Sequence, residues 1–236
     1  MFGFIDPMYV LYVMLPGLVL GLYAQWRVKS AFSRGSQIPS ERGWTGQQVA
    51  QQILDANGIY DVSIEPVQGY LSDHYDPRQK VLRLSPDVYH GRSLAAAGVA
   101  AHEVGHAIQH ARGYAPLAIR NSVVPVANIG SNFGMILVML GAGMGFSSVA
   151  VIGAALFTMV VVFQLVNLPV EFNASSRARE TLVSNGLVSV AEDREVGRVL
   201  HAAAMTYVAA TITAILTLIY LLIRSGLLGG ASRDRD

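Results

Sequence analysis

The chain has 236 residues, of which 52% are hydrophobic and 14% are charged, whereas about a quarter of the residues in an average soluble domain are charged. A formal net charge of +1 argues against nucleic acid as a partner, because a polyanion binder needs a concentrated basic face. The sequence contains no cysteine, which excludes disulfides, thiolate nucleophiles and cysteine zinc sites, so any metal must be held by His, Asp or Glu.

An apolar run over residues 2–25 predicts the first membrane-spanning helix. A helix needs about 20 mostly apolar residues to cross the hydrocarbon core of a bilayer. Asp6 interrupts this run near its start, and Pro16 and Gly17 loosen it. The run lacks a positively charged beginning, so we do not interpret it as a cleavable signal peptide. The basic stretch 27–43 that follows is predicted to be a juxtamembrane linker.

A short amphipathic helix is predicted after this linker. Thr45 is a good N-cap residue, and Gln48 stands three positions later, where it completes a capping box. Apolar side chains then recur on one helical face until Asn57 and Gly58, which supply a stop signal. The pattern therefore predicts one packed helix at the start of the polar segment.

A small β-hairpin is predicted next. Residues 60–67 alternate enough between apolar and polar side chains to indicate a strand. Residues 81–84 are predicted to be its partner, and residues 72–78 to form the turn between them. Such a hairpin would offer an edge strand along which an extended substrate could lie.

A second, longer helix is predicted to begin after the N-cap residue Ser93 and to run to about residues 110–111, before Gly113 stops it. This stretch is rich in alanine. Small side chains allow other elements to approach a helix closely, as they do in packed membrane helices. We therefore expect this helix to be buried among its neighbours.

The long helix carries the pattern His-Glu-x-x-His at residues 102–106. His102 and His106 are four residues apart, so both imidazoles can point at one metal from the same helical face. Glu103 would stand beside the metal, where it can hold a zinc-bound water and take its proton. The alternative is a chance match, but two buried histidines and a glutamate without a metal would be costly to desolvate.

A catalytic zinc site needs a third protein ligand and one open position. In one protease pattern the third ligand is a histidine further along the same helix, but here the Gly and His positions of that pattern hold Gln109 and Arg112. His110 lies a further turn along, too far from a metal centred on the first two histidines. We interpret His110 as a neighbour of the site or a residue at the membrane edge.

Two further spans and a fourth are predicted downstream. From residue 121 to residue 170 there is no Asp, Glu, Lys or Arg, which leaves room for a transmembrane hairpin. Its turn is predicted within residues 141–148, where glycine and serine cluster. Residues 202–223 predict the fourth span. The alternative for each single run is a buried core helix.

Glu171 is the best candidate for the third ligand. Pro169 suits the first turn of a helix, which would put Glu171 near the start of that helix, just past the third span. Polar residues at such a depth are usually functional or paired. The alternative is an ordinary acidic residue at a helix N-terminus. The rival acids Glu180, Asp193 and Glu195 are predicted to be solvated helix charges, and His90 and His201 receive no role.

Basic residues predict the orientation. With four spans, 14 of the 17 Lys and Arg residues fall in the segments 26–120 and 171–201. Because positive residues gather on the cytoplasmic side of inserted helices, both segments are predicted to be cytoplasmic and both termini external. Three arginines in the tail, Arg224, Arg233 and Arg235, argue mildly against this orientation.

Three passages carry a family resemblance: Ala101 to Gln109, Leu71 to Pro77, and Pro169 to Ser175. With them the chain resembles the YugP-like family of neutral zinc metallopeptidases of bacterial membranes. It is more distantly similar to the HtpX and CAAX prenyl protease group. Members of that group also place a transmembrane hairpin between the His-Glu-x-x-His helix and a downstream Glu-x-x-Ala-Asp.

This resemblance implies that His102, His106 and Glu171 ligate Zn²⁺ and that Glu103 is the general base. Ser175 stands where the relatives carry an aspartate that orients a ligand histidine. Either Asn173 or Ser175 could take that role here.

A donor besides zinc is needed for the oxyanion that forms during attack on a peptide carbonyl. His74, Tyr75, Arg177 and Arg179 are the candidates, and the sequence does not rank them. By default, His74 and Tyr75 are simply turn residues.

Together these patterns predict a mainly α integral membrane protein with four transmembrane helices, a small cytoplasmic α+β insertion and a zinc-binding helix. The predicted segments are residues 1–25, 26–120, 121–170, 171–201 and 202–236. The predicted function is a zinc-dependent endopeptidase in the bacterial plasma membrane, with its active site facing the cytoplasm and a peptide or membrane-protein substrate.

Two alternatives come from other classes. The first is a metal-binding membrane scaffold or chaperone-like partner without proteolytic activity, against which the intact Glu103 counts. The second is a transporter or channel subunit, which would predict charges or breaks inside the spans, and the predicted spans show no internal charge. The sequence predicts neither the natural substrate nor the oligomeric state.

Overall fold

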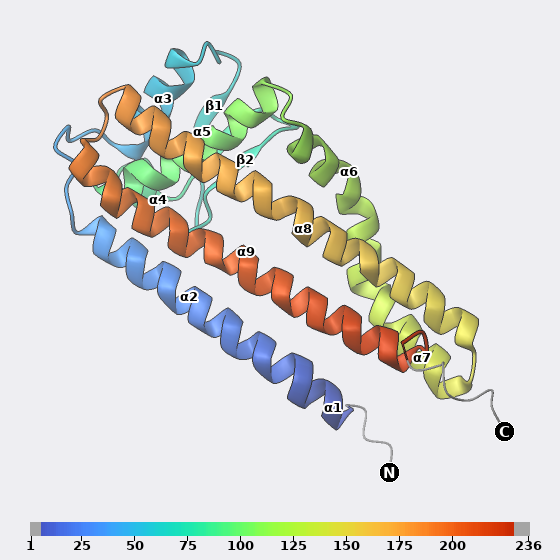
Figure 1. The fold of residues 1–236 in the computed structure, drawn as a ribbon. Coiled ribbons are helices and arrows are strands. Elements are labelled where there is room, and N and C mark those ends of the chain that lie inside the picture. Colours follow the sequence, from blue (N-terminus) through green and yellow to red (C-terminus); the bar gives the residue numbers. More distant parts are fainter. Residues whose placement is uncertain (1–5, 229–236) are drawn as a thin grey trace. The chain divides into compact units, whose positions relative to one another are not determined.

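The computed structural model describes residues 6–228, and the described chain is mostly helical (Figure 1). In chain order, the helical elements are α1 (Pro7–Tyr9), the π-helical segment η1 (Val10–Met14), α2 (Leu15–Ser36), α3 (Gly46–Ala56), α4 (Pro86–Tyr89), α5 (Leu94–Ala111), α6 (Ala115–Ile129), the π-helical segment η2 (Gly130–Gly134), α7 (Met135–Met144), α8 (Ser147–Ser184) and α9 (Val190–Arg224). The strands are β1 (Ser63–Pro66), β2 (His74–Asp76) and β3 (Val81–Leu84). The start of the first predicted span and the tail with Arg233 and Arg235 lie outside the described residues.

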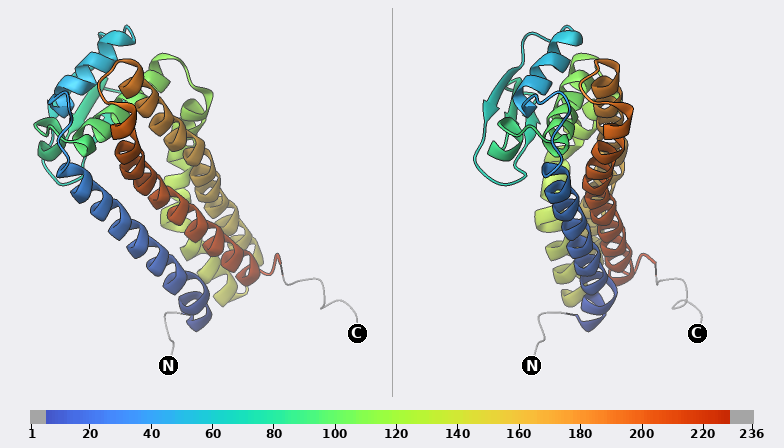
Figure 2. Two further views of the ribbon diagram at one scale, coloured as in Figure 1. Left: turned by 60° about the vertical axis from the view of Figure 1, so that its left-hand side comes forward. Right: turned by 90° about the vertical axis from the view of Figure 1, so that its left-hand side faces the viewer.

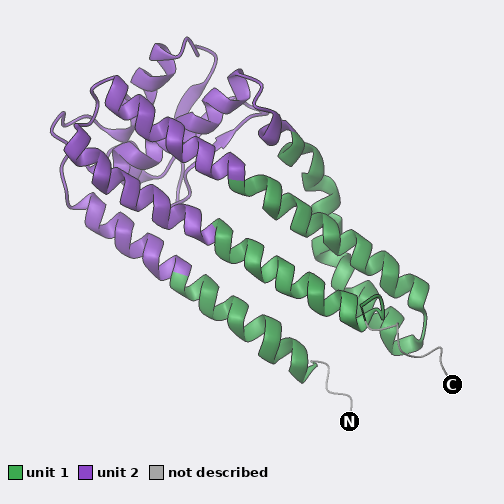
Figure 3. Cartoon of the chain, in the orientation of Figure 1, with its two compact units in different colours: residues 1–23, 119–168, 207–236 green, residues 24–118, 169–206 purple. Residues whose placement is uncertain are grey.

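The chain forms two compact units (Figure 3). The first draws on residues 1–23, 119–168 and 207–236, and the second on residues 24–118 and 169–206. Helices α2, α6, α8 and α9 contribute residues to both units.

Four helical stretches among the described residues are long and apolar enough to cross a membrane. They are Pro7–Ser36, Ala115–Met144, Ser147–Ser184 and Val190–Arg224. The predicted fold class of four candidate membrane helices with a small α+β insertion is confirmed. The predicted turn of the hairpin is also confirmed, since α7 ends at Met144 and Gly145 has the positive φ of +78° that favours glycine.

The first unit is apolar on its outside and packs through small residues inside. Leu18, Val19, Leu22, Phe133 and Ile136 are 53–64% exposed, a surface suited to lipid rather than water. Inside the unit, a Cβ added to the glycine at position 130 would meet the Leu156 carbonyl oxygen at 2.1 Å. Such a contact lets α8 approach η2, which belongs to the other arm of the hairpin, at backbone distance.

The charged residue of the first span is paired within this unit. The Tyr220 hydroxyl donates to Asp6 Oδ2 at 2.9 Å, and Arg224 Nε lies 3.6 Å from the same oxygen. The two partners offset the cost of placing a carboxylate beside apolar surface.

Two predicted helix boundaries were wrong, and both helices are longer than predicted. Residues 27–36 continue α2 instead of forming a linker, and α8 passes through Pro169 without a new start. An interior proline costs about 3 kcal/mol. Buried packing on the same helix, through Val170, Ala174 and Ala178, outweighs this cost. Charge marks where an apolar run ends, not where a helix ends.

In the second unit, both predicted caps are confirmed. Thr45 and Gln48 form the capping box at the start of α3, and Ser93 caps α5 by accepting from the Ala96 N–H. Gly58 and Gly113 follow the two helices with φ of +70° and +61°, conformations that cost glycine little.

The sheet of the second unit differs from the predicted hairpin. Its strand order is β1-β3-β2, with β1 parallel to β3 and β2 antiparallel to β3. The partnership predicted for residues 60–67 with residues 81–84 therefore exists, but in parallel. The stretch predicted as a turn contains β2, one of the two edge strands. Local alternation predicts a strand but not the direction in which it pairs with its partner, which depends on the path of the loop between them.

Helix α5 is buried at the centre of the second unit. It packs against α3 and against β2 and β3, while the first part of α9 lies beside the last part of α8 in both views of Figure 2. The small residues of α5 set its distance from α8 and α9. A Cβ at position 105 would lie 2.7 Å from the Ala174 carbonyl oxygen, and one at position 98 would lie 3.0 Å from Val196. The absence of these atoms lets α8 pack closely against α5 at Gly105 and lets α9 do so at Gly98.

Candidate metal centre

The two histidines of the motif lie one turn apart on α5. The ring centroids of His102 and His106 are 4.9 Å apart and the ring planes are nearly perpendicular, at 86°. Their side chains are each 14% exposed, so both imidazoles are largely shielded from solvent. Glu103, between them in sequence, is buried. Regular helix geometry therefore aims both imidazoles at one point.

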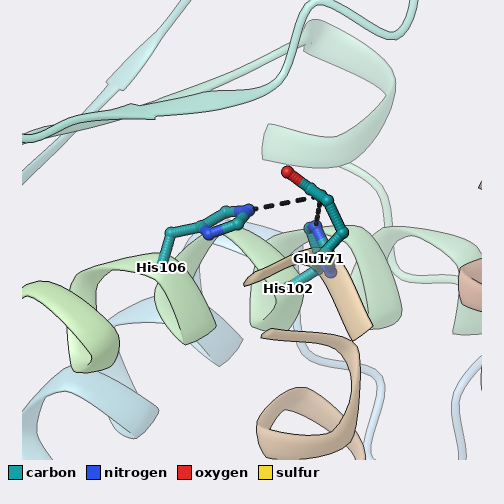
Figure 4. A group of neighbouring side chains, drawn as sticks. All are labelled: His102, His106 and Glu171. Atoms are coloured by element: carbon teal, nitrogen blue, oxygen red, sulfur yellow. Dashed lines mark ion pairs between the residues drawn. The ribbon is translucent and has the colours of Figure 1, made fainter. Parts of the chain in front are cut away.

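Glu171 approaches the same point from α8 (Figure 4). Its Oε2 atom lies 3.4 Å from His102 Nε2 and 3.7 Å from His106 Nε2. All three candidate ligand atoms lie within 4.8 Å of one another. Ligands bound at about 2.0–2.2 Å around a tetrahedral zinc stand about 3.4 Å apart. The spacing of the three atoms thus fits a single zinc ion.

The Oε2 atom of the Glu171 carboxylate lacks a hydrogen-bond donor in the part of the chain that the structure describes. The residue is 3% exposed, and among the described residues Oε2 has no hydrogen-bond donor. Leaving a buried carboxylate oxygen without a hydrogen-bond donor is costly, whereas a divalent cation would satisfy it. Burial lowers the pKa of His106, but the neighbouring carboxylates of Glu171 and Glu103 outweigh this and raise that pKa above its ordinary value. The site therefore attracts a cation.

Both imidazoles are held from behind through Nδ1. Ser175 Oγ lies 3.2 Å from His102 Nδ1, and Gln109 Oε1 lies 3.1 Å from His106 Nδ1. Because the outer nitrogen of each ring is occupied, Nε2 is left to face Glu171. Of the two candidates for orienting a ligand histidine, Ser175 contacts His102 directly. Asn173 contacts Gln109 rather than either histidine.

Gln109 is the residue of this network to which the sequence analysis gave no role. It is fully buried, and its Nε2 donates to the Val170 carbonyl at 2.8 Å and to Asn173 Oδ1 at 3.0 Å. It therefore ties His106 on α5 to α8 on either side of Glu171. The available signal was a polar side chain three residues after His106 in a helix that is otherwise small and apolar.

Asp73 is a second residue that was not singled out. It accepts from the Ser85 N–H at 2.7 Å and from Ser85 Oγ at 3.0 Å. Burial raises the pKa of Asp73, and the negative charge of Glu103 acts in the same direction. Asp73 thus fixes the loop before β2 in electrostatic range of the motif. It lies in the passage Leu71 to Pro77, which was the signal available.

The candidate oxyanion donors on the sheet have different surroundings. His74 is exposed, and its Nδ1 contacts the Ser72 carbonyl at 2.8 Å. The Tyr75 hydroxyl lies 2.9 Å from Nδ1 of His110, one turn beyond His106 on α5. Burial raises the pKa of Tyr75 to about 12, so at neutral pH the phenol keeps its proton and can donate it. His110 stays outside the three-residue cluster.

The two candidate arginines on α8 have partners of their own. Arg177 Nε donates to Asn173 Oδ1 at 2.7 Å, which links it to the network behind His106. Arg179 makes two contacts with Asp193, at 2.9 and 2.6 Å. Arg177 is therefore linked to the candidate metal centre through Asn173, whereas Arg179 is paired with Asp193.

None of the rival acids joins the cluster of described ligand atoms. Glu180 is exposed, and Asp193 is held by Arg179. Glu195 is buried between Arg34 and Arg198, at 3.1 and 2.6 Å, and so is not a solvated charge.

Comparisons with known proteins agree with this arrangement of residues. The model of a family described as "Putative neutral zinc metallopeptidase" matches residues 10–226. A protein of Bacillus subtilis (strain 168) named "Putative membrane protease YugP" is 45% identical over 212 residues, which cover 90% of this chain and 94% of that protein. No solved structure gives a significant match.

Proposed function

Because this chain belongs to the neutral zinc metallopeptidase family whose model it matches, and is a membrane protein, we propose that it is an endopeptidase with one zinc ion at His102, His106 and Glu171. The single observation that carries the proposal is the convergence of these three side chains, with Glu171 Oε2 buried and without a donor among the described residues. A bound zinc ion would polarise the substrate carbonyl and lower the pKa of an attacking water toward neutrality.

Glu103 is the general base in this proposal. It is the one carboxylate of the His-Glu-x-x-His motif, and its neighbours in the helix hold the candidate ligands. Its carboxylate takes the proton of the attacking water and delivers it to the amine nitrogen that leaves. Its burial shields this proton from bulk water. Ser175 and Gln109 keep the two imidazoles from turning while this happens.

Tyr75 is the proposed donor to the oxyanion. It is the middle residue of β2, it is protonated at neutral pH, and its hydroxyl already lies over α5 next to His110. Because β2 is an edge strand beside α5, a substrate extended along its free edge would bring a carbonyl toward both the motif and this hydroxyl. This arrangement favours internal cleavage of a peptide or an extended segment of a membrane protein.

The catalytic test is Glu103→Gln in the purified full chain. We expect cleavage of an unfolded reporter polypeptide to fall by about 10²–10⁴-fold, because the proton acceptor is lost, while bound zinc stays unchanged. Glu180→Gln, an exposed change of the same kind, is the matched control. Undiminished cleavage in Glu103→Gln would refute the assigned base. A zinc-loaded native chain that cleaves nothing would favour the metal-binding scaffold.

Tyr75→Phe tests the oxyanion donor in the same assay. The rate should fall about 10²-fold with zinc content unchanged. Tyr60→Phe, at a position that is 80% exposed, is the control. Equal rates for Tyr75→Phe and the native chain would exclude this role.

The proposed site faces the cytoplasm, which is supported by the distribution of Lys and Arg along the chain. The chain has no cysteine, so single substitutions report position without background labelling. In intact cells, Ser147→Cys in the hairpin should react with an impermeant maleimide, and Ser33→Cys on α2 should react only after permeabilisation. The reverse pattern would overturn this orientation.

A further inference from the structure

A second polar recess of the second unit lies among α2, α8 and α9, outside the metal centre. It is a cavity of about 700 Å³, and arginines from all three helices line it. The lining cationic side chains are Arg27 and Arg34 of α2, Arg179 of α8, and Arg194 and Arg198 of α9, with His201 beside them. No acidic residue of the described chain lines it.

The arginines are only partly neutralised. Arg179 pairs with Asp193, while Arg34 and Arg198 share Glu195. Five guanidinium groups therefore meet two carboxylates, which leaves three positive charges in excess. Arg27 and Arg194 form no ion pair with any described residue. Holding like charges around one cavity is unfavourable unless an anion joins them.

The backbone makes room for this arrangement. A Cβ at position 197 would lie 3.1 Å from the guanidinium carbon of Arg179, so Gly197 lets that group lie against α9. Guanidinium groups present a planar fork of donors that matches phosphate oxygens in pairs. The chemistry of the cavity is therefore that of a phosphate site.

The position of the cavity along the helices identifies the source of the phosphate. Trp26 and Arg27 stand where the apolar run of the first candidate span ends, and Trp26 is 62% exposed. His201 and Ala202 stand where the apolar run of α9 begins. Tryptophan and arginine at such a boundary lie at the depth of lipid headgroups, and basic pockets there bind acidic lipids.

We propose that this cavity binds the phosphodiester headgroup of an anionic membrane lipid. Its phosphate would be held between α2 and α9 by Arg27 and Arg194, with the acyl chains lying along the apolar runs that begin beside it. The bound lipid would tie the end of α2 to α9 and stabilise the folded chain by mass action.

The test measures lipid binding to the purified full chain by native mass spectrometry and by thermal unfolding in detergent. Phosphatidylglycerol should bind and raise the Tm, whereas phosphatidylcholine should not. The double variant Arg27→Gln and Arg194→Gln should bind phosphatidylglycerol about 30-fold more weakly, at roughly a fivefold loss for each charge. The matched control, Lys29→Gln with Arg78→Gln, loses the same charge outside the cavity and should bind within twofold of the native chain.

Three outcomes would overturn the proposal. The first is unchanged affinity in the cavity variant, and the second is an equal loss in the control, which would indicate unspecific attraction to acidic lipid. The third is an equal rise in Tm from inorganic phosphate alone at millimolar concentration, which would assign the cavity to a soluble phosphate.

Discussion

In both units glycine lets helices pack at backbone distance, but the result differs between the units. In the first unit, glycine brings helices to backbone distance, as at Gly130 against the Leu156 carbonyl, and the result is an apolar bundle with large exposed side chains. In the second unit, Gly105 meets the Ala174 carbonyl in the same way, but polar residues flank the contact. Close approach therefore gives only packing in one unit and the candidate metal centre in the other, because the side chains beside the contact differ.

The largest effect expected from this comparison is the loss of Glu171. Glu171→Gln keeps the size of the side chain but removes the charge and one strong ligand oxygen. We expect bound zinc to fall below a tenth of one equivalent and peptide cleavage to fall at least about 10³-fold. Metal analysis of the dialysed chain measures this. Full zinc content in Glu171→Gln would mean that another group completes the site.

A smaller effect is expected from the polar residues behind the histidines. Gln109→Ala frees His106 Nδ1 and removes the Gln109 amide donor from the Val170 carbonyl and from Asn173 Oδ1, which keeps only Arg177 among the described donors. Loss of such an orienting partner typically costs 10–100-fold in metal affinity, which competition with a chromophoric chelator can measure. Ser175→Asp provides the opposite change, because a carboxylate should hold His102 Nδ1 more strongly and tighten zinc binding. Zinc affinity that is the same in both variants would show that Nδ1 contacts are irrelevant.

The smallest expected effect compares glycine substitutions in the two units. Gly105→Ala and Gly130→Ala each place a Cβ against a backbone carbonyl, at 2.7 and 2.1 Å, and should each destabilise the fold by about 1–3 kcal/mol. Only Gly105→Ala should also weaken zinc binding, because it pushes α8 and Glu171 away from α5. Gly143→Ala, with nothing within 4 Å, is the control. If Gly130→Ala weakened zinc binding equally, the distinction between the units would fail.

Local signals in the sequence determined the elements with caps and periodicity. Thr45 with Gln48, Ser93, Gly58 and Gly113 fixed the ends of α3 and α5, because capping involves neighbours within a few residues. The motif at 102–106 needed helix geometry alone to put two imidazoles on one face. Length and hydropathy were enough to identify the candidate spans.

Contacts between distant residues were decided by the tertiary structure. The parallel pairing of β1 with β3, the passage of α8 through Pro169, the role of Gln109 and the arginine cavity all depend on which side chains meet across the fold. Glu171 could be proposed from the sequence as a ligand, but its place opposite His102 and His106 depends on the missing Cβ of Gly105. A local pattern encodes the conformation of its own segment, whereas a site needs the packing that brings separate segments together.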